Sequence, residues 1–339
     1  MKAMVLKKIS SIRERPLELI DLPIPKPGPK QILVKVSACG VCHTELDEIE
    51  GRLPPTIYPI VLGHEIVGRV EGLGSGTSKF KKGNRVGIAW INWACGECSF
   101  CLKGKENLCD RARWTGKDVD GGYAQYTVVS EEFAYPIPER FTDQEAAPLL
   151  CAGTIGYRAL RLSGMEDGQV LGLYGFGASA HIVLQVVKYQ FPHSPVFVFT
   201  RPNQKEHQDL ARKLGADWVG ATEDTPPAKV NCAIDFTPVG LPVREALRNL
   251  EKGGRLVINA IRKETPIPEL DYAQHLWQEK EIKSVANVTR RDAQEFLLLA
   301  AKISIVPKVQ EFKLEEANDA LILLKEGKMQ GAGVLGITE

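Results

Sequence analysis

Hydrophobic and polar positions alternate along the first third of the chain, and the pattern changes near residue 150. Residues 32–37 alternate and are β-branched, and residues 61–76 and 85–93 continue as short strand-like segments divided by glycines. The proline-rich segment 23–29 favours an extended loop. Because helical patterns are scarce here, this part of the chain is predicted to form a β-rich barrel.

After residue 150 the pattern alternates between strands and helices. The predicted order is strand 170–174, glycine turn 175–177, helix through 182–187, strand 196–200, helix 205–214, strand 230–236, helix 242–250 and strand 255–260. Two further helical patterns, 292–302 and 314–326, flank a short strand near Val309. This alternation predicts a doubly wound parallel sheet, so the expected fold class is α/β with a β-barrel.

Length and charge narrow the possible functions. The chain has 339 residues, 44% of them hydrophobic, which is enough for two domains with ordinary cores. The formal net charge is +1 with both signs spread along the chain, so neither nucleic acid nor an anionic membrane is an expected partner. The longest apolar runs are far shorter than the ~20 residues that a bilayer requires, and residues 1–10 lack a signal-peptide core. We expect a cytoplasmic protein.

Four of the eight cysteines crowd into one short segment. Their spacing is Cys95-x2-Cys98-x2-Cys101-x7-Cys109, with glycines that allow the chain to fold back. In an untargeted chain such crowding favours a metal over disulfides, and four thiolates match a closed tetrahedral zinc site. A zinc ion whose four coordination positions are all filled by protein ligands is structural. We expect this zinc to stabilise a small lobe at residues 90–115. Disulfides or free thiols are the alternative.

A second set of candidate ligands is dispersed along the chain as Cys42, His64 and Cys151. Each residue alone is weak evidence for a metal site, because a lone cysteine is more often a small buried hydrophobic residue than a ligand. Together they supply two thiolates and one imidazole. That set leaves zinc a fourth position for water or substrate, which is the composition of a catalytic zinc site.

A glycine turn joins the predicted strand at residue 170 to the following helix. In the run Gly175-Phe176-Gly177-Ala178-Ser179-Ala180, Gly175 is expected to make the tight turn and Gly177 to let a pyrophosphate approach the backbone. The sequence therefore predicts a dinucleotide site at residues 175–178.

The end of the next strand bears on which dinucleotide binds. NAD sites usually carry an acidic residue there, whereas this strand ends in Thr200 and Arg201. A hydroxyl and a guanidinium suit a 2′-phosphate better than a diol, which favours NADP. Stacking of Arg201 on the adenine, which permits NAD, is the alternative.

Read in order, these motifs resemble the zinc-dependent alcohol dehydrogenases of the medium-chain dehydrogenase/reductase family. The resemblance covers essentially the whole chain and rests on Gly40-Val41-Cys42-His43-Thr44, Gly63-His64-Glu65, the four-cysteine lobe, Asp120-Gly121-Gly122-Tyr123-Ala124, the Cys151 segment and the dinucleotide turn. It implies a GroES-like catalytic domain at 1–152 and 296–339, with a Rossmann domain at 153–295 between its two parts.

The resemblance also implies roles for individual residues. Cys42, His64 and Cys151 are expected to bind the catalytic zinc. Further roles are Glu65 as an alternative ligand, Thr44 as the group that takes the alcohol proton, His43 and Arg290 near the cofactor phosphates, and Trp90 in the substrate pocket. Asp47 stands where many members carry the outer histidine of a proton relay. Cys39 and Cys232 match no ligand position and are expected to be buried thiols.

The expected activity is reversible hydride transfer between a primary or secondary alcohol and NAD(P), with two zinc ions per chain and a dimer or tetramer as the assembly. A polyol or amino-alcohol dehydrogenase of the same family is the alternative, although polyol members often lack a cysteine at the position of Cys151. A zinc-free quinone reductase is disfavoured because it lacks the ligands. A nucleic-acid-binding zinc ribbon is disfavoured by the near-neutral charge.

Overall fold

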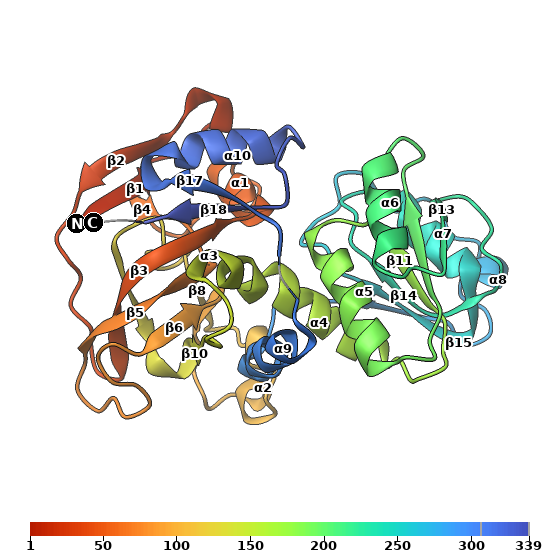
Figure 1. The fold of residues 1–339 in the computed structure, drawn as a ribbon, viewed down its shortest axis with the longest axis horizontal. Coiled ribbons are helices and arrows are strands. Elements are labelled where there is room, and N and C mark those ends of the chain that lie inside the picture. The colour runs from red at the N-terminus through yellow and green to blue at the C-terminus, as the bar shows by residue number, and fades with distance from the viewer. Residues whose placement is uncertain (306, 338–339) are drawn as a thin grey trace. The chain divides into compact units, whose positions relative to one another are not determined.

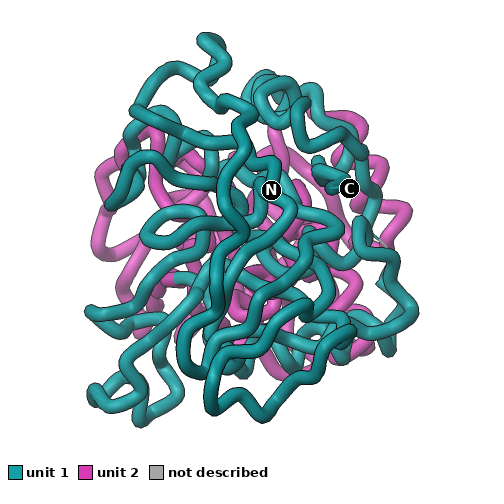
Figure 2. The backbone as a smooth tube through the Cα atoms, turned by 90° about the vertical axis from the view of Figure 1, so that its left-hand side faces the viewer, with its two compact units in different colours: residues 1–151, 287–339 teal, residues 152–286 magenta. Residues whose placement is uncertain are grey.

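The computed structural model describes residues 1–305 and 307–337 and divides into two compact units. Unit 1 comprises Met1–Cys151 and Asn287–Glu339, and unit 2 comprises Ala152–Ala286 (Figure 2). The second boundary lies nine residues before the expected one at 295, because the helix that starts at Arg290 packs as a whole on unit 1.

Unit 1 is built from short, mostly antiparallel strands (Figure 1). They are β1 (Lys2–Leu6), β2 (Leu17–Asp21), β3 (Gln31–Val41), β4 (Ile60–Val61), β5 (Ile66–Leu73), β6 (Arg85–Ile88), β7 (Ile91–Trp93), β8 (Arg113–Trp114), β9 (Tyr126–Ser130), β10 (Ala134–Pro136), β17 (Val309–Lys313) and β18 (Ala332–Gly336). The largest sheet has the order β10-β6-β5-β3-β18-β17, with β9 also paired to β3, and a smaller sheet has the order β2-β1-β4.

The long strand β3 organises this unit. Its burial alternates along the first half and becomes continuous near Cys39, as expected for a strand that enters the core. It pairs with β5 and β9 and, through Gly333 opposite Val41, with β18 from the far end of the chain. Cys42 follows directly after β3, so this central strand determines where the first predicted zinc ligand lies.

Helices in unit 1 are short except one. They are α1 (His43–Ile49), α2 (Ser99–Leu102), α3 (Asp143–Ala146), α9 (Arg290–Ile303) and α10 (Ala317–Lys325). The 3₁₀ segments in this unit are η1 (Ile12–Glu14), η2 (Glu106–Leu108), η3 (Glu131–Phe133), η4 (Ala147–Leu150) and η5 (Leu314–Glu316). Thr289 caps α9 by accepting a hydrogen bond from the backbone N–H of Asp292, which explains why the helix starts there.

Unit 2 is a parallel six-stranded sheet with helices. The strands are β11 (Leu171–Tyr174), β12 (Val196–Thr200), β13 (Trp218–Ala221), β14 (Val230–Asp235), β15 (Leu250–Ile258) and β16 (Glu281–Ser284), in the order β13-β12-β11-β14-β15-β16. The helices are α4 (Ala152–Ser163), α5 (Ala178–Gln190), α6 (Lys205–Lys213), α7 (Leu241–Asn249) and α8 (Tyr272–His275). This is the strand order of a doubly wound dinucleotide-binding sheet, which confirms the predicted fold class.

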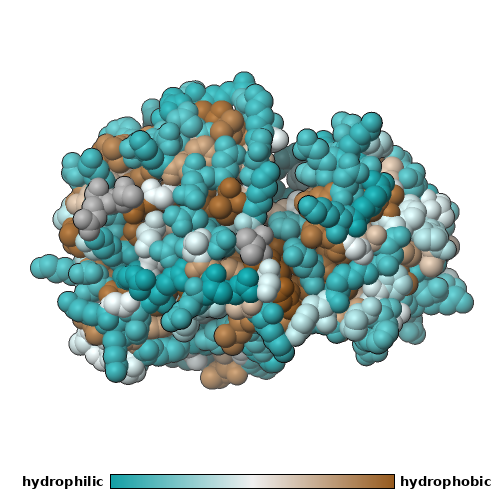
Figure 3. All heavy atoms as spheres, viewed as in Figure 1, coloured by the Kyte–Doolittle hydropathy of each residue, from teal (hydrophilic) through white to brown (hydrophobic). Residues whose placement is uncertain are grey.

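Hydrophilic side chains cover much of the face shown in Figure 3, with apolar side chains scattered among them. Within the described ranges, no helix is both long enough and apolar enough to cross a membrane. Cys39 and Cys232 are buried, as predicted.

Candidate metal centres and dinucleotide turn

The four clustered cysteines converge in the structure. One sulfur from each of Cys95, Cys98, Cys101 and Cys109 lies within 4.8 Å of all the others, and the Sγ atoms of Cys95 and Cys101 are 3.8 Å apart. Four sulfurs held about 2.3 Å from a tetrahedral zinc ion are about 3.8 Å from one another. The lobe therefore has the spacing that zinc requires.

The dispersed set also converges. Ligand atoms of Cys42, His64, Glu65 and Cys151 all lie within 4.8 Å of one another, and the Cys42 and Cys151 sulfurs are 3.9 Å apart. We call these four residues the Cys42 group. The two sulfurs share a hydrogen bond, which lowers the pKa of Cys42 and raises that of Cys151. Two half-buried cysteines, a buried imidazole and a buried carboxylate are a donor set that fits zinc.

The start of α1 positions part of this group. Cys42 is the N-cap residue in an extended conformation, and the backbone turns into the helix at His43. The thiol of Cys42 donates a hydrogen bond to the hydroxyl of Thr44 at 3.6 Å. Thr44 is almost fully buried, whereas His43 is exposed. The cap thus places a sulfur and a hydroxyl side by side.

Glu45 is a buried residue of this site that the sequence reasoning missed. Its Oε2 accepts a hydrogen bond from the backbone N–H of Cys42 at 2.9 Å, and its Oε1 lies 2.6 Å from Nδ1 of His64. Burial is the largest single influence and opposes protonation of His64, but the charges of Glu45 and Cys42 and the hydrogen bonds to them together outweigh burial and raise the histidine's pKa. A carboxylate on the outer nitrogen of a ligand histidine fixes the ring orientation. A signal was available, since a glutamate three residues after a helix cap is the capping-box pattern.

Glu65 lies close to the two sulfurs and is buried, with 4% of its surface exposed. Burial is the main cause that raises its pKa, followed by the charge of Cys42. Gly40 leaves room for it, because a side chain at position 40 would overlap the carboxylate of Glu65. This glycine explains why the carboxyl group reaches the sulfurs.

Two other predicted residues have partners of their own. The carboxylate of Asp47 accepts a hydrogen bond from Nε of Arg52 at 2.5 Å. The indole of Trp90 lies 5.9 Å from the His64 ring and 5.0 Å from the ring of Trp114. Trp90 therefore borders the Cys42 group, and Asp47 is held by a cation.

The glycine turn of unit 2 has the predicted form. Gly175 follows β11 with φ of +82°, a conformation that favours glycine, and its N–H donates to the carbonyl of Phe199. Gly177 caps α5, and a Cβ built there would meet nothing within 4 Å. Phe176 is buried between them and Ala178 begins the helix. Open space above a helix N-terminus fits a diphosphate.

Thr200 and Arg201 close the neighbouring strand, as predicted. The hydroxyl of Thr200 accepts a hydrogen bond from Nε2 of Gln208 at 3.0 Å and donates to the carbonyl of Arg201. The side chain of Arg201 is exposed. The guanidinium is thus available to an anionic ligand, while the threonine hydroxyl is already engaged.

Arg290 contacts carboxylates in the structure. Its Nε donates to Glu106 at 3.1 Å, a terminal nitrogen donates to Glu132 at 3.3 Å, and the guanidinium lies 5.1 Å from the centre of the Phe133 ring. This network joins the four-cysteine lobe to the first turn of α9. The phosphate-binding role of Arg290 stays a prediction. A cofactor phosphate that binds Arg290 must compete with these two carboxylates for the guanidinium.

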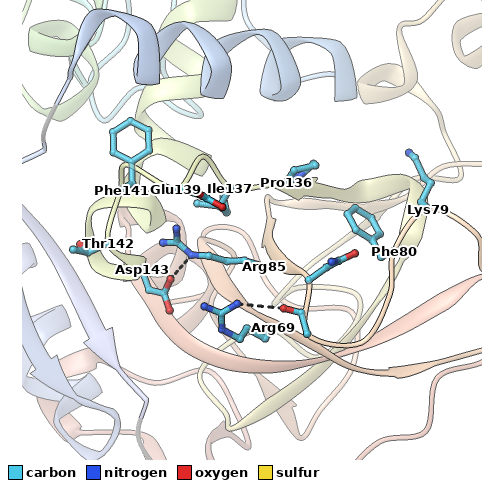
Figure 4. A pocket seen from close by; sticks show the side chains of 12 residues that line it. Arg69, Lys79, Phe80, Arg85, Pro136, Ile137, Glu139, Phe141, Thr142 and Asp143 are labelled. Carbon is cyan, nitrogen blue, oxygen red and sulfur yellow. Dashed lines mark hydrogen bonds and ion pairs between the residues drawn. The ribbon is translucent and has the colours of Figure 1, made fainter.

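A hollow on unit 1, of about 760 Å³, contains none of the predicted site residues (Figure 4). Its two arginines are paired within the chain: Arg85 with Asp143 at 2.6 Å, and Arg69 with the carbonyl of Gly83 at 3.2 Å. It offers no group of convergent ligands comparable to the Cys42 group.

Comparisons with known proteins agree with this geometry. The alcohol dehydrogenase GroES-like domain family matches residues 28–139. A protein of Mycobacterium tuberculosis named "probable alcohol dehydrogenase" is 45% identical over 94% of this chain and 92% of its own length. An alcohol dehydrogenase of Geobacillus stearothermophilus is 36% identical over 100% of both chains.

Solved structures give the same result. The chain matches an NAD-dependent alcohol dehydrogenase with a TM-score of 0.89 and 26% identity over 100% of both chains. It matches the alcohol dehydrogenase of the archaeon Aeropyrum pernix with a TM-score of 0.85 and 27% identity over 99% of both. With two cysteine-based metal groups and a dinucleotide turn in one polypeptide, the chain belongs to the zinc-type alcohol dehydrogenases of the medium-chain dehydrogenase/reductase family.

Proposed function

We propose that this alcohol dehydrogenase works with zinc bound by Cys42, His64 and Cys151, with Glu65 as an alternative ligand, and with a second, structural zinc in the 90–115 lobe. The convergence of the four ligand atoms within 4.8 Å carries this proposal. Zinc in such a site supplies Lewis acidity, which favours loss of a proton from an alcohol near neutral pH.

The chain's own groups handle the proton. The hydroxyl of Thr44 lies beside the Cys42 sulfur, where it can accept a hydrogen bond from the alcohol and take up its proton. Asp47, one turn of α1 after Thr44, is a candidate for the next step, and Arg52 holds its carboxylate. A proton that leaves Thr44 then reaches Asp47 through water or a ribose hydroxyl. A pH–rate profile that is unchanged in Asp47→Asn removes Asp47 from the relay.

The hydride acceptor is a nicotinamide dinucleotide whose diphosphate binds at the Gly175–Ala178 turn. The exposed Arg201 at the end of β12 favours NADP, because a guanidinium pairs with a 2′-phosphate through charge-assisted hydrogen bonds. The NAD-dependent relative supports the alternative cofactor. In Arg201→Ala we expect the ratio of kcat/KM with NADP to kcat/KM with NAD to fall at least about tenfold. An unchanged ratio refutes the NADP preference.

The decisive experiment is oxidation of primary, secondary and benzylic alcohols with NAD and NADP in parallel, followed at the nicotinamide absorbance. Cys151→Ala is expected to abolish activity and to lower the zinc content from two ions per chain to one. Cys232→Ala is the control, since this buried cysteine lies outside both metal groups. Full activity in Cys151→Ala contradicts the proposed ligand set.

We also propose a homo-oligomer assembled through unit 2. Strand β16 lies at the edge of the parallel sheet, all four of its residues are exposed, and Ile282 is 41% exposed. An exposed edge strand offers unpaired backbone groups to a second copy. Light scattering is expected to show a dimer or tetramer that dissociates in Ile282→Lys but not in the control Leu298→Lys on α9. A monomeric wild-type protein refutes this assembly.

A further inference from the structure

Helix α1 carries one buried carboxyl group that the proposed mechanism does not use. Glu48 is 0% exposed, and neither of its carboxyl oxygens has a hydrogen-bond partner among the residues that the structure describes. Its neighbours on the helix differ, because Glu45 binds Cys42 and His64 and Asp47 binds Arg52. A buried carboxyl group without a partner is costly, and native proteins keep one mainly where a ligand or water completes it.

The helical repeat places Glu48 on the side of α1 that carries the Cys42 group. Thr44 precedes Glu48 by four residues and Glu45 precedes it by three, and both spacings put side chains on the same helix face. Thr44 and Glu45 contact Cys42 and His64 respectively. Glu48 thus lies one turn, about 6 Å, further along the helix than the hydroxyl that takes the alcohol proton.

Electrostatic coupling agrees with this placement. Burial is the main cause that raises the pKa of Glu48, and the charges of Glu45, His64 and Cys42 act on it as well. The carboxyl group is therefore within electrostatic reach of the proposed zinc site without touching a ligand.

Glu48 interacts electrostatically with residues of two loops. Lys117 lowers the pKa of Glu48, and Glu48 in turn raises the pKa of Tyr58 after the larger effect of burial. The two loops are joined, since the backbone N–H of Thr56 donates to the carbonyl of Lys117 at 3.0 Å. The ammonium group of Lys117 is held by Asp118 at 3.0 Å, which leaves Glu48 without a protein partner.

A second buried polar atom without a hydrogen-bond partner among the described residues lies near His64, on the indole of Trp90. Nε1 of Trp90 is buried and has no hydrogen-bond acceptor within the described part of the chain, and its ring lies 5.9 Å from that of His64. One donor and one carboxyl group near the reaction centre thus lack partners. A purely apolar alcohol leaves both unsatisfied.

We propose that Glu48 is a specificity-determining residue that binds a second hydroxyl group of the substrate, so that the preferred substrates are diols whose two hydroxyls stand on separated carbons. A hydroxyl both donates and accepts, so it pairs with a carboxyl group in either protonation state, whereas an ammonium group pairs only with the carboxylate. The distance of one helical turn from Thr44 favours separated over adjacent hydroxyls. This inference rests on the proposed alcohol oxidation.

The test compares 1,4-butanediol with 1-pentanol, in which a methyl group replaces the second hydroxyl. The wild-type protein with its zinc is expected to favour the diol at least about tenfold in kcat/KM, because the alcohol without the second hydroxyl leaves a buried group unpaired. Glu48→Leu is expected to lower that ratio at least about tenfold, and Glu48→Gln, which still forms hydrogen bonds, to retain most of it. Glu50→Leu is the matched control, since Glu50 is already bound by Arg52 and Lys325.

Each outcome decides the matter. Equal use of both alcohols by the wild-type protein overturns the role of Glu48 and leaves the proposed function intact, even if Glu48→Leu does not fold. A diol preference that survives in Glu48→Leu also overturns it. Preference for 4-amino-1-butanol over the diol overturns the assignment of a hydroxyl. Oxidation of no alcohol refutes the proposed function and this inference together.

Discussion

Replacing Glu45 by glutamine is expected to weaken zinc binding at the Cys42 group about tenfold. Glu45 is completely buried, so water does not screen its contact of 2.6 Å with Nδ1 of His64. A hydrogen bond to a charged group contributes about 1.5–3 kcal/mol and a neutral one about 0.5–1.5 kcal/mol. The difference of roughly 1–1.5 kcal/mol corresponds to about a tenfold change in affinity. Glu45→Ala removes both contacts, and there we expect about a hundredfold loss.

The assay is competition for zinc with a chromophoric chelator, which resolves two affinities per chain. The four-cysteine lobe is an internal reference, because Glu45 contributes nothing to it and its affinity must stay unchanged. Glu131→Gln is the control variant, since this buried carboxylate accepts backbone N–H groups of Ser78 and Lys79 outside both metal groups. If the zinc affinity of the Cys42 group in Glu45→Ala stays within twofold of the wild-type value, the orienting role of the carboxylate is refuted.

Two further predictions concern stability. Cys109→Ser removes one of four ligands from a lobe with little apolar core, so we expect zinc content to fall by one ion per chain and the Tm to drop, measured by metal analysis and calorimetry. Burial opposes ionisation of Glu50, but hydrogen bonds from Lys325 and Arg52 outweigh it and hold the pKa of Glu50 at about 2, against 4.5 ordinarily. A depressed pKa contributes stability that is complete above pH 4.5 and is lost as the pH falls towards 2. In urea unfolding, the advantage of the wild type over Lys325→Met is therefore expected to shrink across that pH range, and a constant difference contradicts this linkage.

The success of prediction from sequence depended on how local each signal is. The four-cysteine lobe was predictable from spacing alone, because all its ligands lie within one short segment. The members of the Cys42 group come from three distant parts of the chain, so spacing gave no signal. Their residue types suggested a catalytic zinc set, and the family resemblance supported the grouping. The alternation of strands and helices in unit 2 was readable because buried parallel strands are continuous apolar runs.

The missed elements have physical reasons. Strand β16 is exposed along its whole length, so it carries no hydrophobic pattern, and β18 is rich in glycine and is stabilised by pairing with the distant β3. Glu48 was missed because a glutamate among acidic neighbours on a helix usually faces solvent. Only the tertiary structure shows that water does not reach it.

Helix α1 shows why these buried acidic residues occur together. Leu46 and Ile49 pack into the hydrophobic core of unit 1, which fixes the rotation of the helix about its axis. With that rotation fixed, Glu45 and Glu48 must point to the side of the zinc ligands. The helix is too short to carry either side chain out to solvent. Such a helix is stable only if its charges find partners, and Glu45 finds one in His64. The remaining carboxyl group, on Glu48, then needs a partner from outside the protein, and the substrate is the molecule that this side of the helix is built to receive.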